Sequence, residues 1–266
     1  MKQALAKDRS GGMRAWLAGL EDGAVLRFAF YALLAGTAGV LYVDFGELAE
    51  NAPPPALTQM PMPILPPATT PGGGGQERPP VTTSPELLES PLEIALGSGG
   101  VLRLTGTIDP GSSARFLAEI EARGEYVSTV LLDSPGGSVD DALSIGGLIR
   151  ERELSTEVAD GGLCASSCPL IFAGGKERTA GRDAAIGVHQ IYAAALSATP
   201  IDALSVAGVA MADAQAVTAD ITRHLSESGI DPALWLHALE TPPDQLYYFS
   251  PEEMERFKLV TQWSEK

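Results

Sequence analysis

Residues 127–150 read VSTVLLDSPGGSVDDALSIGGLIR, a stretch that passes from an apolar run through a glycine turn into an amphipathic run. The apolar run 127–132 (VSTVLL) is typical of a buried strand, and the turn 133–137 (DSPGG) ends it. Residues 139–150 carry apolar side chains at three- and four-residue spacing, which predicts a helix. A buried strand followed at once by such a helix predicts a right-handed crossover and a largely parallel sheet.

The alternation of short apolar runs and amphipathic runs continues on both sides of this stretch. We expect strands at residues 101–108, 154–158 and 185–190, helices at 114–122, 203–224, 232–239 and from about 166 and 251, and short closing segments at 246–249 and 259–263. Strands that alternate with helices along a chain predict an α/β fold.

Proline marks where the folded part of the chain begins. Of the 20 prolines in the 266 residues, 12 fall between Pro53 and Pro91. Residues 46–92 also contain the glycine run 72–75 and show little apolar periodicity, so they cannot bury enough surface to offset their ordering entropy. We expect residues 46–92 to be a disordered linker that reaches on the order of 100 Å when extended. Residues 93–266 are then expected to form one folded domain.

An uncharged apolar segment precedes the linker. Residues 28–43 (FAFYALLAGTAGVLYV) contain no charged side chain, and residues 28–45 are long enough to span a membrane as a helix. A cleaved signal peptide would have its apolar region closer to the N-terminus, and a soluble core helix would find nothing in the linker to pack against. We expect an uncleaved transmembrane anchor, with the cleaved signal and the core helix as the alternatives.

Charge is unevenly distributed along the chain. Residues 1–27 carry five Lys or Arg and three acidic residues, whereas the whole chain has a net charge of −16, so the remainder carries −18. Because segments rich in Lys and Arg tend to stay in the cytoplasm, residues 1–27 are expected to be a cytoplasmic tail. The expected location is the inner membrane, crossed once, with a periplasmic or otherwise extracytoplasmic C-terminal domain. So acidic a domain excludes nucleic acid as a partner.

Three short segments carry side chains suited to chemistry. The glycines of the turn 133–137 allow backbone N–H groups to face an anion. Residues 164–168 (CASSC) place Ser166 at the expected start of a helix, where a serine can lie beside N–H donors. His189 lies at the end of the expected strand 185–190. Each segment alone also has an ordinary structural interpretation, as a turn, a helix N-cap and a hydrogen-bonded histidine.

The order and spacing of these segments resemble the proteolytic subunit of the Clp protease and its relatives within the crotonase-like fold. In that family a Ser-Pro-Gly-Gly turn ends a strand, a serine starts a helix that closes with glycine nine residues later, and a His-Gln pair follows. This chain has SPGG at 134–137, Ser166 with Gly175 nine residues on, and His189-Gln190 after that. The resemblance covers about residues 100–265 and implies repeated ββα units with a largely parallel sheet.

The resemblance also implies functions for individual residues. Ser166 corresponds to the nucleophile and His189 to the general base that takes its proton. The backbone N–H groups of Gly137 and Ser167 correspond to the oxyanion hole.

The acid of the triad matches the family less well. The family has an aspartate shortly before a Pro-Glu pair that opens a helix, and here Pro251 begins that pair. The matching position holds Gln245, with Asp244 one residue earlier. Asp244 is therefore the expected acid, with Asp231 or a dyad supported by water as the alternatives.

Cys164 and Cys168 are the only cysteines in the chain, and they flank Ser166. Outside the cytoplasm two cysteines often pair, although regular helix geometry at a four-residue separation is poor for a disulfide. The alternative is a pair of small, buried side chains. No Cys and His lie together at ligand spacing, so we expect neither zinc nor any other cofactor in the site.

Together these features predict a serine peptidase or hydrolase that acts through an acyl-enzyme on peptides or unfolded proteins outside the cytoplasm. A homo-oligomer is one candidate assembly. The alternative is a non-catalytic, membrane-tethered scaffold or binding domain on the same fold. A third interpretation, an acyl-CoA hydratase or isomerase, is disfavoured because its cofactor is cytoplasmic.

Overall fold

The structure is a computed structural model, and it describes residues 22–51, 64–68, 79–190 and 200–264. The chain divides into two compact units, Met1–Pro61 and Met62–Lys266. The described part of the first unit is a single helix, α2 (Asp22–Asn51). All the motif segments named above lie in the second unit.

Helix α2 is 30 residues long. Its segment Leu26–Val43 is long and apolar enough to cross a membrane, and none of it is buried. The expected anchor, residues 28–45, lies within this helix. The helix continues to Asn51, so the first residues of the expected linker are helical.

The larger sheet of the second unit has six strands in the order β1-β2-β3-β4-β6-β9. The strands are β1 (Glu93–Leu96), β2 (Val101–Thr105), β3 (Thr129–Asp133), β4 (Ser155–Val158), β6 (Arg178–Ala180) and β9 (Gln262–Trp263). β1 pairs antiparallel with β2, and every other neighbouring pair is parallel. The sheet is therefore mixed but mostly parallel, in agreement with the expected α/β class.

A smaller sheet has three strands in the order β5-β7-β8. They are β5 (Leu163–Ala165), β7 (Ala185–Val188) and β8 (Tyr247–Tyr248). β5 and β7 are parallel, whereas β8 pairs antiparallel with β7. An isolated bridge between Ser134 and Cys164 connects this sheet to the end of β3. The segments that follow β3, β5 and β7 are thereby brought to one region of the fold.

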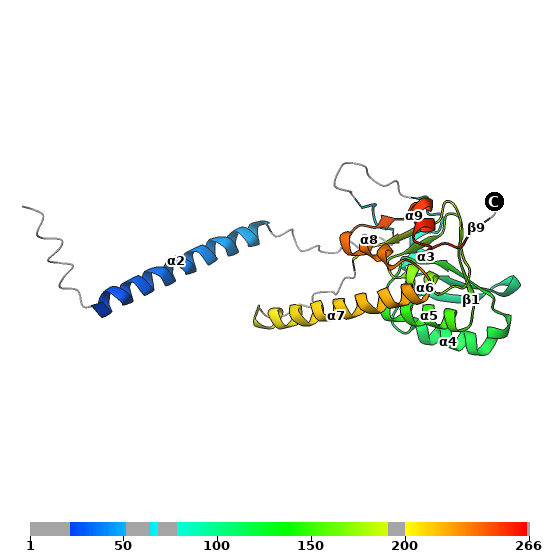
Figure 1. Cartoon of the computed structure of the whole chain (residues 1–266), viewed down its shortest axis with the longest axis horizontal. Coiled ribbons are helices and arrows are strands. Elements are labelled where there is room, and N and C mark those ends of the chain that lie inside the picture. The colour runs from blue at the N-terminus through cyan, green and yellow to red at the C-terminus, as the bar shows by residue number, and fades with distance from the viewer. Residues whose placement is uncertain (1–21, 52–63, 69–78, 191–199, 265–266) are drawn as a thin grey trace, which may run out of the picture. The chain divides into compact units, whose positions relative to one another are not determined.

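Helices cover the sheets, and the larger ones coincide with the expected amphipathic segments. They are α3 (Pro85–Glu89), α4 (Ser112–Arg123), α5 (Val139–Glu151), α6 (Cys168–Ala173), α7 (Pro200–Glu227), α8 (Trp235–Glu240) and α9 (Pro251–Arg256). In Figure 1, α4 and α5 lie together at the lower side of the folded domain, and α8 and α9 lie at its upper side.

The core explains why α4 and α5 form where they do. α4 buries Phe116 and Ile120, and α5 buries Ala142, Ile145 and Ile149 at three- and four-residue spacing. These side chains belong to one apolar cluster that also contains residues of both sheets. Because this spacing places the apolar side chains on one face of each helix, both helices can pack on that cluster.

The expectation of a disordered linker over residues 46–92 is wrong for the parts that the structure describes. Leu88 of α3 is 0% exposed, and Ala68 is buried. Residues 64–68 pair with the chain near β8, with Pro67 bridging Leu246. The folded unit therefore begins before residue 93, because a few apolar side chains between the prolines suffice to bind this segment to it.

Candidate active site

Ser166 lies in the two-residue connection between β5 and α6. Helix α6 begins at Cys168, two residues later than expected. Ser166 has φ 60°, in the left-handed region that residues other than glycine rarely adopt. Its N–H donates a hydrogen bond of 2.9 Å to the carbonyl of Gly187 in β7. The surrounding structure thus fixes a strained serine beside β7, a form of strain that occurs at functional sites.

His189 directly follows β7 and lies against this serine. β5 and β7 are parallel neighbours with Ala165 opposite Gly187, so the residues after both strands lie at the same edge. The Nε2 atom of His189 is 2.7 Å from the Oγ atom of Ser166. The structure therefore brings together the two residues that the sequence predicts as nucleophile and base.

The other ring nitrogen of His189 fixes the tautomer. Nδ1 lies 2.9 Å from the carbonyl oxygen of Pro243. Because a carbonyl oxygen can only accept a hydrogen bond, Nδ1 carries the proton and donates it. In the neutral ring Nε2 is then an acceptor that faces the hydroxyl of Ser166, as a general base requires.

The structure does not bring the expected acid to the histidine. Asp244 is exposed, and among the described residues no carboxylate contacts His189. The carbonyl of Pro243, one residue earlier, lies at Nδ1 instead. The alternative acid, Asp231, accepts a hydrogen bond of 3.0 Å from the N–H of Ala233 and caps a short 3-10 turn. Sequence patterns could not identify Pro243 because every residue has a carbonyl group.

Burial affects the protonation of His189. Loss of hydration lowers its pKa below the ordinary 6.5, and the hydrogen bond to Pro243, which favours the protonated form, opposes this only in part. His189 is therefore neutral at pH 7 and able to accept a proton.

The glycine turn after β3 lies against the serine. Gly136 and Gly137 have φ of 94° and 143°. A Cβ atom on Gly136 would lie 2.6 Å from the Cβ of Ser166, so only glycine permits this approach. Ile108 holds the turn from its other side, because its N–H donates to Gly136 at 2.8 Å and its carbonyl accepts from the N–H of Ser138 at 2.7 Å.

The expected oxyanion-hole donors lie on two segments in contact with each other. The hydroxyl of Ser167 donates a hydrogen bond of 3.3 Å to the carbonyl of Gly137. The backbone N–H groups of both residues donate to no acceptor in the part of the chain that the structure describes. Free N–H groups beside a nucleophile can stabilise the negative charge that develops in acyl transfer.

Cys164 and Cys168 form a disulfide that encloses Ser166. Both cysteines are 0% exposed. Of the two alternatives left open by the sequence, the structure has the disulfide, because the connection between β5 and α6 is not helical at Ser166. The bond ties the end of β5 to the first residue of α6.

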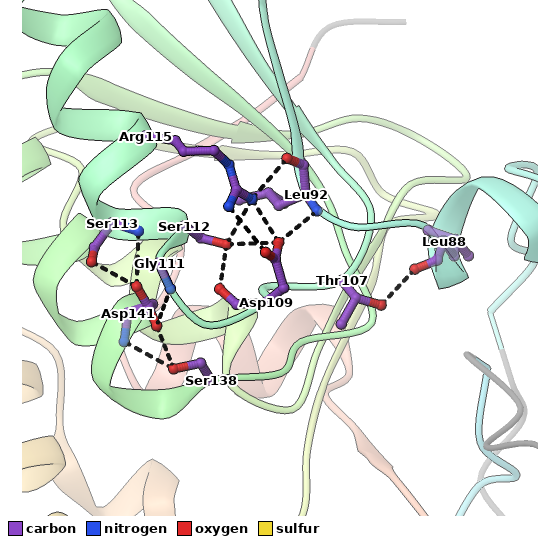
Figure 2. A network of polar contacts seen from close by, with 10 residues as sticks. All are labelled: Leu88, Leu92, Thr107, Asp109, Gly111, Ser112, Ser113, Arg115, Ser138 and Asp141. Atoms are coloured by element: carbon purple, nitrogen blue, oxygen red, sulfur yellow. Dashed lines mark hydrogen bonds and ion pairs between the residues drawn. The ribbon is translucent and has the colours of Figure 1, made fainter.

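A group of polar contacts connects α4 to Ser138, the residue directly after the glycine turn (Figure 2). Asp141 of α5 accepts hydrogen bonds from the N–H of Ser113 at 2.9 Å and from its hydroxyl at 2.6 Å. Its second carboxylate oxygen accepts a hydrogen bond of 2.6 Å from the hydroxyl of Ser138, which directly follows the turn. Asp141 is 8% exposed, so this carboxylate is a buried connection between α4 and the turn.

Asp109 is the centre of a second group of polar contacts beside the first (Figure 2). It directly follows Ile108, pairs with Arg115 at 2.6 Å and accepts a hydrogen bond of 3.0 Å from the N–H of Leu92. The Arg115 guanidinium holds the pKa of Asp109 well below its usual range, so this carboxylate stays charged. Neither Asp109 nor Asp141 is among the residues predicted from the sequence. The pattern Ser138-x-x-Asp141, which is typical of a helix N-cap, could have drawn attention to the second.

Metal ligation finds no support in the described residues, which contain no group of three or more His, Cys, Asp or Glu able to hold an ion. No protein-family model matches the chain, and no curated protein sequence matches it. The site is therefore characterised by its own geometry, a serine and a histidine in hydrogen-bond contact within an α/β domain.

Proposed function

We propose that this chain is a membrane-anchored serine hydrolase of the peptidase type. The observation that carries the proposal is the 2.7 Å contact between Oγ of Ser166 and Nε2 of His189. The other ring nitrogen, Nδ1, donates a hydrogen bond to a carbonyl. This arrangement allows His189 to remove the serine proton as the hydroxyl attacks.

The reaction proceeds by acyl transfer. Oγ of Ser166 attacks the carbonyl carbon of a peptide bond, and its proton moves to Nε2 of His189. The N–H groups of Gly137 and Ser167 stabilise the oxyanion of the tetrahedral intermediate. When the intermediate collapses, the C–N bond breaks and the leaving amine takes the proton from Nε2. Water then attacks the acyl-enzyme with the same histidine as base, releasing the acid and restoring the Ser166 hydroxyl.

The proposal includes a relationship to the proteolytic subunit of the Clp protease, with repeated ββα units of the crotonase-like fold. Three features support it: the SPGG turn lies against Ser166, the serine precedes a short helix, and the histidine follows a neighbouring parallel strand. The carbonyl of Pro243 in place of an acid distinguishes this chain within that relationship.

The proposed location is the cytoplasmic membrane, with α2 as anchor, residues 1–27 inside and the catalytic domain outside the cytoplasm. The basic tail supports this orientation, and the disulfide supports an oxidising compartment. Because ATP-driven unfolding is a cytoplasmic process, the proposed substrates are peptides or unfolded proteins.

A fluorophosphonate probe, which reacts covalently with activated serines, tests the proposal. The full-length chain in detergent is expected to be labelled, and Ser166→Ala is expected to abolish the labelling. Ser226→Ala is the matched control, because Ser226 is an exposed serine on α7. A folded wild-type chain that takes up no probe, or that labels equally after Ser166→Ala, contradicts the proposal.

The second candidate function is a tethered binding domain without catalysis. The observation that favours it is that, among the described residues, a carbonyl and no carboxylate lies at Nδ1 of His189. The acid of a triad stabilises the imidazolium that forms during the reaction. Absence of probe labelling together with a normal cooperative unfolding transition would support this alternative.

A further inference from the structure

The small sheet that carries Ser166 and His189 packs against an apolar cluster of its own. The cluster comprises Leu88, Leu163, Ala165, Ala185, Leu246 and Tyr248, with Ile64, Leu65 and Val81 packed against it. Four of these nine side chains come from the segment between the membrane helix and residue 93. The tether, as we call residues 52–92, therefore supplies part of the apolar cluster that packs against β5 and β7, the strands that precede Ser166 and His189.

Residues 64–68 also pair with the residue that precedes β8. The N–H of Leu246 donates to the carbonyl of Pro66 at 2.9 Å, and its carbonyl accepts from the N–H of Ala68 at 2.8 Å. The hydroxyl of Tyr248 donates a hydrogen bond of 3.0 Å to the carbonyl of Leu65. The two backbone bonds form an isolated parallel bridge between Pro67 and Leu246, the residue that directly precedes β8.

This bridge lies next to the loop that orients the histidine. Leu246 is three residues after Pro243, whose carbonyl accepts the hydrogen bond from Nδ1 of His189. Without residues 64–68 the backbone N–H and carbonyl of Leu246 would lose their partners. The loop would then be free to move the carbonyl that fixes the tautomer of His189.

A second contact of the tether reaches the start of the glycine turn. The hydroxyl of Thr83 donates a hydrogen bond to Oδ2 of Asp133, and Oδ1 of the same carboxylate accepts one of 3.0 Å from the N–H of Leu163. The N–H of Thr82 donates to the carbonyl of Gly161 at 2.9 Å. Asp133 is the last residue of β3 and directly precedes the turn that contains Gly136 and Gly137.

We propose that residues 64–68 and 79–89, here called the strap, are a positioning element of the active site and not a passive spacer. The strap holds the Pro243 loop through Leu246 and the glycine turn through Asp133, so it fixes the histidine and the oxyanion donors relative to Ser166. The catalytic consequence rests on the proposed hydrolase function, whereas the effect on the two loops does not.

Two substitutions in the full-length chain separate the contacts. Thr83→Val removes the hydroxyl donor to Asp133 and preserves the shape of the side chain. Ala68→Pro removes the N–H donor to Leu246, because proline has no backbone N–H. Thr83→Ser keeps the hydroxyl and is the conservative variant. Thr222→Val, on the exposed face of α7, is the matched control for Thr83→Val.

Amide hydrogen exchange is measured over residues 133–138 and 241–248, together with the rate of fluorophosphonate labelling. We expect Thr83→Val to accelerate exchange in the first segment and Ala68→Pro in the second, each by about tenfold, the factor that corresponds to one lost hydrogen bond. Labelling is expected to slow by about the same factor in both, and Thr83→Ser and Thr222→Val are expected to stay within about twofold of wild type.

The two proposals fail in different ways. If exchange in both segments is unchanged by Thr83→Val and Ala68→Pro, the strap does not position the loops and the inference is wrong. Faster exchange with unchanged labelling also overturns it, because the loops would then move without consequence for the site. If the wild-type chain takes up no probe, the hydrolase proposal fails, and the exchange measurements still decide whether the strap holds the two loops.

Discussion

Both ring nitrogens of His189 have hydrogen-bond partners: Nε2 contacts the hydroxyl of Ser166, and Nδ1 contacts the carbonyl of Pro243. In a Ser-His-Asp triad a charged carboxylate lies at Nδ1, whereas this carbonyl is neutral. A carbonyl dipole at Nδ1 orients the ring and fixes its tautomer as a carboxylate does. It stabilises the imidazolium less, because it carries no net charge, and burial further disfavours the protonated form. His189 therefore stays neutral, and can act as a base, at a lower pH than an ordinary histidine, but it binds the proton that it accepts less strongly.

This leads to a prediction for the pH dependence of probe labelling. The base must be neutral, and a lowered pKa means that it becomes protonated only at a pH below the ordinary 6.5. The labelling rate, measured between about pH 4.5 and 8, should therefore stay near its maximum as the pH falls through 6.5 and decrease only below it. Circular dichroism over the same range shows whether the fold persists. A half-maximal rate at or above pH 6.5 contradicts the prediction.

A second prediction at this scale concerns Asp244. Because this exposed side chain does not contact His189, Asp244→Asn should reduce the labelling rate less than about threefold, whereas loss of a true triad carboxylate costs about four orders of magnitude. Asp213→Asn, at an exposed position on α7, controls for the change of charge. A loss of about a hundredfold or more specific to Asp244→Asn would mean that its carboxylate reaches the histidine during the reaction.

The sequence located the parts of the site whose chemistry depends on side chains or on glycine. Ser166, His189 and the glycine turn occur at spacings that the fold brings together, and their types are informative. The partner of Nδ1 could not be predicted, because a backbone carbonyl at Pro243 leaves no signature in the sequence. The family pattern before Pro251 indicated Asp244 instead, which is one residue away from the carbonyl that lies there.

Among the elements, amphipathic helices were predictable and very short strands were not. α5 has the bounds Val139–Glu151 against the expected 139–150, because three buried apolar side chains repeat along it. β5 and β6 have three residues each, too few to show an alternating pattern. β5 is also buried at every position, so it has no polar face that would reveal its period.

The disulfide permits a prediction at the scale of the element that contains Ser166. It closes a five-residue loop, for which the chain-entropy model gives a stabilisation of about 2 kcal/mol. The double variant Cys164→Ala, Cys168→Ala should lose about this free energy of unfolding in urea, and its probe labelling should slow because the strained turn at Ser166 loses a constraint.

The measurement needs a control for general loss of stability. Ile149→Val, in the core and away from the site, removes one buried methylene group and costs about 1 kcal/mol. If labelling slows to the same extent in this variant, the disulfide acts on the site only through global stability. Unchanged labelling in the double cysteine variant would show that the bond does not position Ser166.

At the scale of the whole molecule, amino-acid composition gave a wrong prediction of disorder for the described parts of the tether. Proline and glycine content predicts disorder. The described segments 64–68 and 79–92 nevertheless pack apolar side chains against the domain and form hydrogen bonds with it. Composition averages over a window, whereas docking depends on a few residues such as Leu65 and Leu88. The same stretch can therefore look like a spacer in sequence and still contribute to the core of the folded unit.

The predicted orientation of helix α2 in the membrane depends on the basic residues that precede its apolar segment. Residues 1–27 contain five Lys or Arg, and residues 44–63 contain none, so the N-terminal side should stay in the cytoplasm. A cleavable tag appended after Lys266 should then be removed by protease added outside bacterial cells whose outer envelope has been opened. The full chain should also remain in membranes after an alkaline wash, because the apolar segment Leu26–Val43 would be exposed to water on release.

Replacing the five basic residues by Gln and inserting Lys residues after Asn51 should protect the tag, since the charge difference across the helix is then reversed. Protection of the tag in the wild-type chain would place the domain, and its disulfide, in the cytoplasm and remove the support for an extracytoplasmic hydrolase.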